Sequence, residues 1–283
     1  MTPVTTAVRA GLRRGLIELR QTMSTAQDVV NFLLPAAVFL VVMLFLRQVP
    51  VKDAPISVGA MSLPSMLGLN VAFGGLLAMA QTLTAEREDG TLLRAKAVPN
   101  GMLGYLIGKI VTISGSTVAA VLVLLVPGVL LFEGIGLTSL GAWLTLAWVL
   151  VLGLVATMPL GAVLGSLFTS PRSAALVMLP IMGLSVISGI FYPITVLPQW
   201  VQLVAQCSPI YWLGLGMRSA MLPDSAVVAE IAHSWRPLET FGVLAVWAVL
   251  GLVLAPVVLR RMARRESGSS VAARREKAMQ RIG

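Results

Sequence analysis

The side chains of this sequence that could do chemistry gather in one short charged segment. It carries both signs of charge around a glycine, and it comprises Glu86, Arg87, Glu88, Asp89, Gly90, Thr91, Leu92 and Arg94. A cluster of this kind suits a polar docking surface for a soluble partner. The glycine permits a sharp turn, and Pro99 ends any helix that begins at Thr91. On physical grounds alone, a solvated loop that only fixes the orientation of the chain is the simpler interpretation.

The sequence has few residues of the types that disulfides, metal sites and nucleotide sites require. The single Cys207 excludes an intrachain disulfide, and the single His233 leaves no zinc-type cluster. The nearest approach to a P-loop, at residues 104–110, has the wrong glycine spacing and no Ser or Thr after its lysine. His233 and Glu230 form only a generic polar pair. We therefore expect no catalytic residue, metal or nucleotide site, and we expect Lys109 to extend its amine toward the membrane interface.

Composition defines the class of protein. Of 283 residues, 57% are hydrophobic and 12% are charged, and the mean hydropathy is +0.89. The charged share is about half that of a soluble globular domain. These values exclude a soluble enzyme, a disordered chain and a collagen-like fibre. They predict an all-α integral membrane protein.

Stretches without charge are long enough for membrane-spanning helices, which need about 20 apolar residues. They predict six spans, at about residues 29–46, 62–84, 108–132, 141–168, 173–191 and 240–259. After the fifth span, prolines leave two interpretations: a second full span, or an element that enters the membrane and returns. Six spans place 17 of the 21 Lys and Arg residues on the side of both termini. The positive-inside rule then favours six spans with both termini in the cytoplasm.

Residues 193–217 accordingly form an external re-entrant or interfacial element. Its characteristic residues are Pro193, Pro198, Trp200, Pro209 and Tyr211. Irregular backbone at membrane depth needs a cover of protein or a water-filled cavity. The aromatic residues Tyr192, Trp200, Tyr211 and Trp212 are candidate anchors at the level of the lipid headgroups. An ordinary external loop remains the alternative.

Two basic segments flank the six spans. Apolar residues recur at helical spacing from Val8 to Met23, so residues 5–22 predict an amphipathic helix in the membrane interface, with its arginines toward anionic headgroups. Residues 261–283 predict a basic, flexible cytoplasmic tail beyond a transmembrane domain of residues 1–260. Aromatic residues do not interleave with the tail charges, so we expect membrane lipids and no nucleic acid as partners.

The charge-free stretches also limit the mechanism. Ion-coupled transporters and pumps usually keep ionisable residues inside the membrane, and the two halves of this chain show no inverted repeat. Active transport by this chain therefore needs energy from another polypeptide. Uncharged spans suit an apolar or amphipathic substrate better than a small ion.

Two motifs connect these features to a known family. Residues 86–92, followed by Pro99, read E-R-E-D-G-T-L, and residues 191–218 contain F-Y-P, L-P-Q-W, S-P-I-Y-W and Arg218. The first is similar to the E-R-E-x-G-T-L segment, and the second to the P…LP.W…NP…R signature, of the type-2 ABC transporter permease family. Within this family the sequence resembles the drug-resistance branch of the daunorubicin type. Ser208 stands where the family more often has asparagine, and we expect it to cap or turn the chain as asparagine does.

The resemblance implies a partner and an assembly. The interfacial helix near residues 5–22 and a coupling element near residues 86–97 would contact a separate ATPase subunit. The implied coupling residues are Glu86, Arg87, Glu88, Gly90, Thr91, Leu92 and Arg94. Two permeases, expected to be a homodimer, and two ATPase subunits would assemble. ATP and magnesium would bind to the partner, with no cofactor in this chain.

The implied function is that of an exporter permease, without its own enzymatic activity, in the plasma or inner membrane. It would move an amphipathic drug or lipid-like substrate, and the second and fifth spans would line most of the route between the two permeases. The external re-entrant element would close the outer gate. The sequence does not indicate the substrate-binding residues. Two alternatives remain: a membrane anchor or sensor that transports nothing, and export of a lipid-linked polysaccharide by the same fold.

Overall fold

The computed structural model describes residues 3–24, 26–51, 55–132, 134–168 and 178–265. Within these residues the regular elements are helices, and a single antiparallel bridge joins Pro50 to Ser57. The α-helices are α1 (Pro3–Thr22), α2 (Ala26–Phe45), α3 (Val58–Phe73), α4 (Met79–Glu88), α5 (Thr91–Lys96), α6 (Gly101–Leu131), α7 (Leu140–Leu167), α9 (Met178–Ile187), α10 (Gln199–Cys207), α11 (Pro209–Met221) and α12 (Pro237–Arg265). The prediction of an all-α protein is confirmed.

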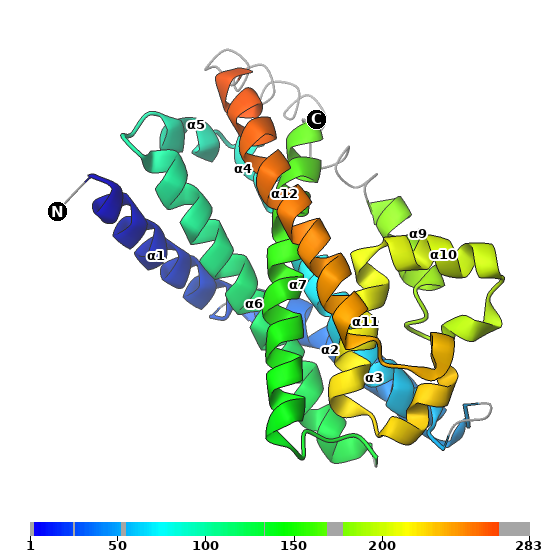
Figure 1. Cartoon of the computed structure of the whole chain (residues 1–283). Coiled ribbons are helices and arrows are strands. Elements are labelled where there is room, and N and C mark those ends of the chain that lie inside the picture. The colour runs from blue at the N-terminus through cyan, green and yellow to red at the C-terminus, as the bar shows by residue number, and fades with distance from the viewer. Residues whose placement is uncertain (1–2, 25, 52–54, 133, 169–177, 266–283) are drawn as a thin grey trace, which may run out of the picture.

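Short helices of other types complete the fold. A π-helical turn, η2 (Gly74–Ala78), joins α3 and α4 into one continuous helical segment. Four 3-10 turns lie in connections: η1 (Leu46–Gln48), η3 (Ile194–Val196), η4 (Asp224–Ala229) and η5 (Ile231–His233). Figure 1 shows α1 lying beside α6, and α12 beside α7.

Four described helical segments are long and apolar enough to cross a membrane: Val58–Glu88, Gly101–Leu131, Leu140–Leu167 and Pro237–Met262. They coincide with the predicted second, third, fourth and sixth spans. The predicted first and fifth spans coincide with shorter apolar helices, Leu33–Gln48 and Met178–Ile187. Residues 169–177, which include the start of the predicted fifth span, lie outside the described residues. The chain is thus a multi-pass helical membrane protein.

Two helices extend beyond the predicted spans, for local reasons. The helix of the second predicted span begins at Val58, because the Ser57 hydroxyl caps it by accepting a hydrogen bond from the Ala60 N–H. Pro64 is accommodated inside this helix. The last helix continues to Arg265 and so takes in the first residues of the predicted tail. Residues 266–283 lie outside the described residues.

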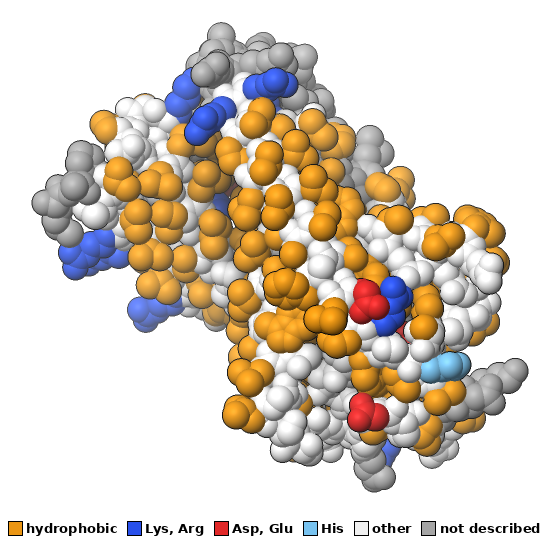
Figure 2. Space-filling view, viewed as in Figure 1, with side chains coloured by type: hydrophobic (Ala, Val, Ile, Leu, Met, Phe, Trp, Pro, Cys, Tyr) orange, Lys and Arg blue, Asp and Glu red, His pale blue; other side chains and the backbone are white. Residues whose placement is uncertain are grey.

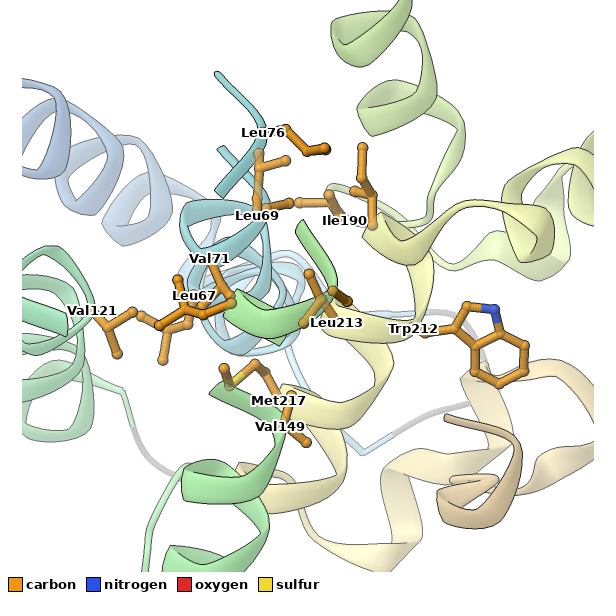
Figure 3. Packing of buried hydrophobic residues seen from close by; sticks show 14 of the residues in the cluster. Leu67, Leu69, Val71, Leu76, Val121, Val149, Ile190, Trp212, Leu213 and Met217 are labelled. Atoms are coloured by element: carbon orange, nitrogen blue, oxygen red, sulfur yellow. The ribbon is translucent and has the colours of Figure 1, made fainter. Parts of the chain in front are cut away.

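Helix α11 occupies the centre of the protein. Its residues Leu213, Leu215 and Met217 are fully buried, and the helix packs against α3 and α7. Figure 3 shows Leu213 and Met217 among side chains of these two helices, including Leu67 and Val149. The backbone of α11 approaches α3 closely, since a side chain at Gly68 would meet the Leu213 carbonyl at 2.7 Å. This part of the predicted external element therefore belongs to the hydrophobic core.

Charged side chains are unevenly distributed along the molecule. In the view of Figure 2, most Lys and Arg side chains lie over α1 and around the end where α5 and the last turns of α12 are found. Hydrophobic side chains cover the middle parts of α6, α7 and α12 in the same view. The basic end of the molecule therefore contains the charged segment that the sequence singles out.

Candidate functional site

The charged segment folds into two short helices joined by a turn. Helix α4 ends at Glu88, and Gly90 adopts a left-handed backbone conformation with φ +81° before α5 begins. The Asp89 carboxylate accepts a hydrogen bond from the Thr91 N–H at 2.7 Å, which fixes the start of α5. Because few residues other than glycine adopt this φ easily, the predicted role of Gly90 as a turn is confirmed. The segment is thus helical on both sides of this turn and is not an irregular loop.

Glu86 points into the protein. Its Oε1 lies 2.5 Å from Nζ of Lys109 on α6. The same Lys109 Nζ donates to Oε2 of Glu18 on α1 at 2.6 Å, and the lysine side chain is only 5% exposed. The prediction that Lys109 reaches the membrane interface is therefore wrong, because two carboxylates hold its amine inside the protein. One lysine thus joins α1, α4 and α6.

The Glu18 carboxylate is the second centre of this cluster. It also accepts a hydrogen bond from Arg14 Nε at 2.8 Å and one from the Thr112 hydroxyl at 3.3 Å. Burial opposes ionisation of Glu18, but the hydrogen bonds from Lys109 and Arg14 outweigh it and lower the pKa of Glu18 below its ordinary value. The bond to Glu18 likewise raises the pKa of Arg14. Both groups are charged at neutral pH.

Arg87 holds the end of another helix. Its Nη1 donates to the carbonyl oxygens of Ser166 at 3.1 Å and Phe168 at 2.8 Å, at the carboxyl end of α7. Carbonyl groups there have no partner within their own helix, and a cation at that end also interacts favourably with the helix dipole. Arg87 is 7% exposed. Glu86 and Arg87 thus anchor the segment to its neighbours.

The remaining residues of the segment form its outer face. Leu92 is buried beneath α5, whereas Arg94 and Lys96 are exposed and Glu88 and Thr91 are partly exposed. Arg94 Nη2 donates to the Thr91 hydroxyl at 3.1 Å. Of the predicted coupling residues, Glu88, Thr91 and Arg94 can therefore contact a partner, while Gly90 and Leu92 shape the turn and its packing.

Glycines bring α1 against α6. Gly11 and Gly15 of α1 face Gly104 and Gly108 of α6, and a side chain at Gly15 would meet the Gly108 carbonyl oxygen at 2.6 Å. Small residues four positions apart on both helices allow such close packing. The apolar residues Leu12, Leu16 and Ile17 remain exposed on α1. The four-residue spacing of these glycines is visible in the sequence, and it is the signal there that corresponds to this contact.

A second charge cluster lies in the core beside α11. Arg218 Nε donates to Glu230 Oε1 at 2.6 Å, and Nη2 donates to Oε2 at 3.2 Å. Nη1 donates to the Ser65 hydroxyl at 2.8 Å. Arg218 and Glu230 are 0% and 1% exposed. The predicted pair of Glu230 with His233 is wrong, because the carboxylate is bound by Arg218 and the His233 ring instead contacts the Val228 carbonyl at 3.1 Å.

The other residues of the predicted external element shape its chain path. Pro193 precedes η3, Pro198 precedes α10, and Pro209 is the first residue of α11. The Ser208 hydroxyl accepts a hydrogen bond from the Ile210 N–H at 3.1 Å, so its predicted capping role is confirmed.

The aromatic residues of this element are divided between surface and interior. Trp200 is 70% exposed and remains a candidate membrane anchor. Tyr211 and Trp212 are buried, with their ring centroids 5.1 Å apart. Their predicted role as headgroup anchors is wrong, because α11 carries both rings into the core.

The described helices define a multi-pass membrane protein with a charged, turn-linked pair of helices at one end. Among the described residues, no group of three or more His, Cys, Asp and Glu side chains could hold a metal ion. The family model of the ABC-2 family transporter proteins matches residues 17–255. The chain belongs to this family, and it is a membrane permease component of an ABC transporter. A search of curated proteins gives no significant match.

Proposed function

We propose that the chain is the permease subunit of an ABC exporter that moves an amphipathic drug or lipid-like compound outward across the plasma or inner membrane. A separate ATPase subunit supplies the energy, and it binds the ATP and magnesium. Two copies of each subunit form the transporter, with the two permeases as a homodimer. Six spans, with both termini in the cytoplasm, place the basic end seen in Figure 2 on the ATPase side.

The observation that carries this proposal is the path from α5 into the membrane. Helices α3, η2 and α4 form one helical segment, Val58–Glu88, and only the Gly90 turn separates it from α5. A force on α5 is therefore applied directly to the end of a membrane-spanning helix. Lys109 and Arg87 connect the same end to α6 and α7, so that movement of α5 also reaches those helices.

The proposal gives the predicted coupling residues two different roles. Glu88, Thr91 and Arg94 contact the ATPase, because they lie on the outer face of the segment. Glu86 and Arg87 pass the movement on, because their side chains bind α6 and α7. Gly90 and Leu92 hold the turn and the position of α5.

The hairpin of α10 and α11 is the proposed re-entrant outer gate. Its α11 is covered by α3 and α7, as a helix inside the membrane requires when its ends are irregular. The exposed Trp200 on α10 would face lipid or the second permease. The ion pair of Arg218 and Glu230 neutralises both charges near this gate, which suits an uncharged or amphipathic substrate.

Transport into inside-out membrane vesicles tests this function. The double variant Glu88→Ala/Arg94→Ala should lower ATP-dependent uptake of a fluorescent amphipathic compound about tenfold, a typical size for a lost coupling between sites. ATP hydrolysis by the purified complex should continue. Glu239→Ala is the matched control, because Glu239 is an exposed charge at the start of α12, away from the coupling segment. Unchanged uptake in the double variant would contradict the coupling assignment.

A further inference from the structure

The helical segment of the second span is irregular near its middle. Residues Gly74–Ala78 form the π-helical turn η2, with the regular helices α3 and α4 on either side. Each N–H of a π-helical turn bonds the carbonyl five residues earlier, so the turn holds one residue more than the α-helical turn that it replaces. Such turns are rare, and they are frequent at functional sites. The second span can therefore change its path at this level.

The backbone of α7 is also weakened, at Pro159. Proline has no N–H, so Pro159 cannot donate a hydrogen bond to the Val155 carbonyl, four residues earlier. The Thr157 hydroxyl donates to the Gly153 carbonyl at 2.7 Å, and such side-chain bonds often bend a helix. Helix α7 therefore bends most easily near Pro159.

These two irregular regions touch each other. A side chain at Gly75 of the π-helical turn would meet the Thr157 hydroxyl and, at 3.0 Å, the backbone nitrogen of Met158. A side chain at Gly161 of α7 would meet the Leu76 carbonyl oxygen at 2.7 Å. Glycines at such contacts bring two backbones together with little interlocking of side chains. The turn and the Pro159 region therefore lie in one layer.

Helix α12 adds a third weak point to the same layer. This helix lies beside α7 (Figure 1). A side chain at Gly251 of α12 would meet the Pro159 Cβ atom at 3.0 Å and the Leu160 nitrogen at 3.4 Å. Glycine weakens the interior of a helix. Three neighbouring helices thus have a π-helical turn, a proline and a glycine at one level.

The helix parts on the two sides of this layer are held by different contacts. On the basic side, the Thr84 hydroxyl donates to the Gly165 carbonyl at 3.3 Å, and Arg87 binds the end of α7. Leu259 and Met262 near the end of α12 are buried there. On the other side, α3 and α7 pack against α11. The basic ends therefore form one unit, and the opposite halves hold α11.

We propose that Gly74–Ala78, Pro159 and Gly251 form a hinge layer, at which the basic ends of the second span, α7 and α12 bend together. A push on α5 then tilts three membrane helices at once, while the packing around α11 stays intact. The use of this hinge in transport rests on the proposed function, because the force on α5 comes from the ATPase subunit.

Hydrogen–deuterium exchange of the purified chain in nanodiscs tests the hinge layer without a partner. In the wild type, the amides of residues 74–79 and 155–161 should exchange at least about tenfold faster than those in the flanking turns, because their hydrogen bonds open more easily. Pro159→Ala supplies the missing N–H and should slow exchange at residues 155–161 about tenfold. Because the two regions share one layer, exchange at residues 74–79 should slow as well.

Pro127→Ala is the matched control. Pro127 is also an interior proline of a membrane-spanning helix, but it lies near the far end of α6 and outside the layer. This variant should change exchange at residues 74–79 less than twofold. Unchanged exchange at residues 74–79 in Pro159→Ala, or an equal change in Pro127→Ala, would overturn the proposal.

Single-residue deletions test the layer from the second span. Deletion of Ala78 shortens the π-helical turn to an α-helical one, so both flanking helices keep their buried faces. The chain should fold, and exchange at residues 155–161 of α7 should slow. Deletion of Ala72, which is buried in α3, rotates the rest of the span by about 100° and should prevent folding. Equal loss of folding in both deletions would overturn the proposal.

Transport by the complex separates a failure of the hinge from a failure of the proposed function. In inside-out vesicles, Pro159→Ala should lower ATP-dependent uptake about tenfold while ATP hydrolysis continues, and Pro127→Ala should transport as the wild type does. Absence of uptake by the wild type would contradict the proposed function, and the exchange measurements would still decide the hinge. Slowed exchange with wild-type uptake in Pro159→Ala would overturn the role of the hinge in transport.

Discussion

Nζ of Lys109 lies 2.5 Å from Oε1 of Glu86, and this pair joins the end of a membrane-spanning helical segment to a neighbouring helix. The same amine also binds Glu18 of α1. A single cation therefore fixes the positions of three helices at the basic end of the protein. The proposed coupling of α5 to the membrane helices depends on this arrangement.

Removal of the cation should destabilise the protein. Lys109→Met leaves Glu18 and Glu86 largely buried without their main partner, and we expect a loss of about 3 kcal/mol. Thermal unfolding in detergent measures the effect. Arg20→Met is the control, because Arg20 is exposed on α1, and its melting temperature should stay close to that of the wild type. Equal melting temperatures for Lys109→Met and the wild type would show that the ion pairs of Lys109 with Glu18 and Glu86 do not stabilise the fold.

The ionisation of Glu18 should make stability depend on pH. Its pKa is lowered from the ordinary value of 4.5, so its contribution is complete above that pH and is lost as the pH falls through the lower folded value. Glu18→Gln should therefore be less stable than the wild type at neutral pH. The difference in melting temperature should shrink as the pH falls below about 4.5. A difference that stays constant over this range would contradict the assignment.

Loss of one partner of the buried Arg218–Glu230 pair should destabilise the protein more than loss of Lys109. Arg218→Met leaves the Glu230 carboxylate almost completely buried without a partner, and the expected loss is about 3–5 kcal/mol. The double variant Arg218→Met/Glu230→Met removes both charges and should recover much of that loss. Unfolding midpoints of the single and double variants provide the comparison. If the double variant is as unstable as the single variant, the loss is due to packing and not to the unpaired charge.

The glycine contact should control the attachment of α1. Gly15→Leu places a side chain where the Gly108 carbonyl oxygen and the Val111 side chain now lie, so α1 must move away from α6. Limited proteolysis should then cleave the N-terminal segment at least several-fold faster than in the wild type. Leu16→Ala is the control, because Leu16 is exposed on the same helix. Equal cleavage rates for Gly15→Leu and the control would contradict the contact.

Much of the fold follows from the amino-acid pattern, because apolar stretches in a charge-poor chain have few alternatives to membrane helices. The second, third, fourth and sixth predicted spans coincide with long apolar helices. The turn at Gly90 follows from its neighbours in sequence, as does the cap at Ser208. These features depend on local residues, which a sequence displays directly.

The partners of charged residues could not be predicted in the same way. Lys109 meets Glu18, which lies 91 residues earlier in the chain, and the relative rotation of the two helices decides that contact. Arg87 belongs to the predicted coupling residues, and its guanidinium binds the end of α7. The depth of α11 likewise depends on its packing against α3 and α7. Tertiary packing determines these two contacts and the depth of α11, and no local sequence pattern predicts that packing.

The most direct test of the proposed function is to purify the tagged chain gently from its native membrane and to identify the proteins that remain bound. The account predicts an ATPase subunit in equal amount, cross-linked to the permease through a photo-reactive residue placed at Arg94. Its ATP hydrolysis should respond to amphipathic compounds. An intact preparation that contains no ATPase would contradict the exporter proposal and would favour a membrane anchor or sensor.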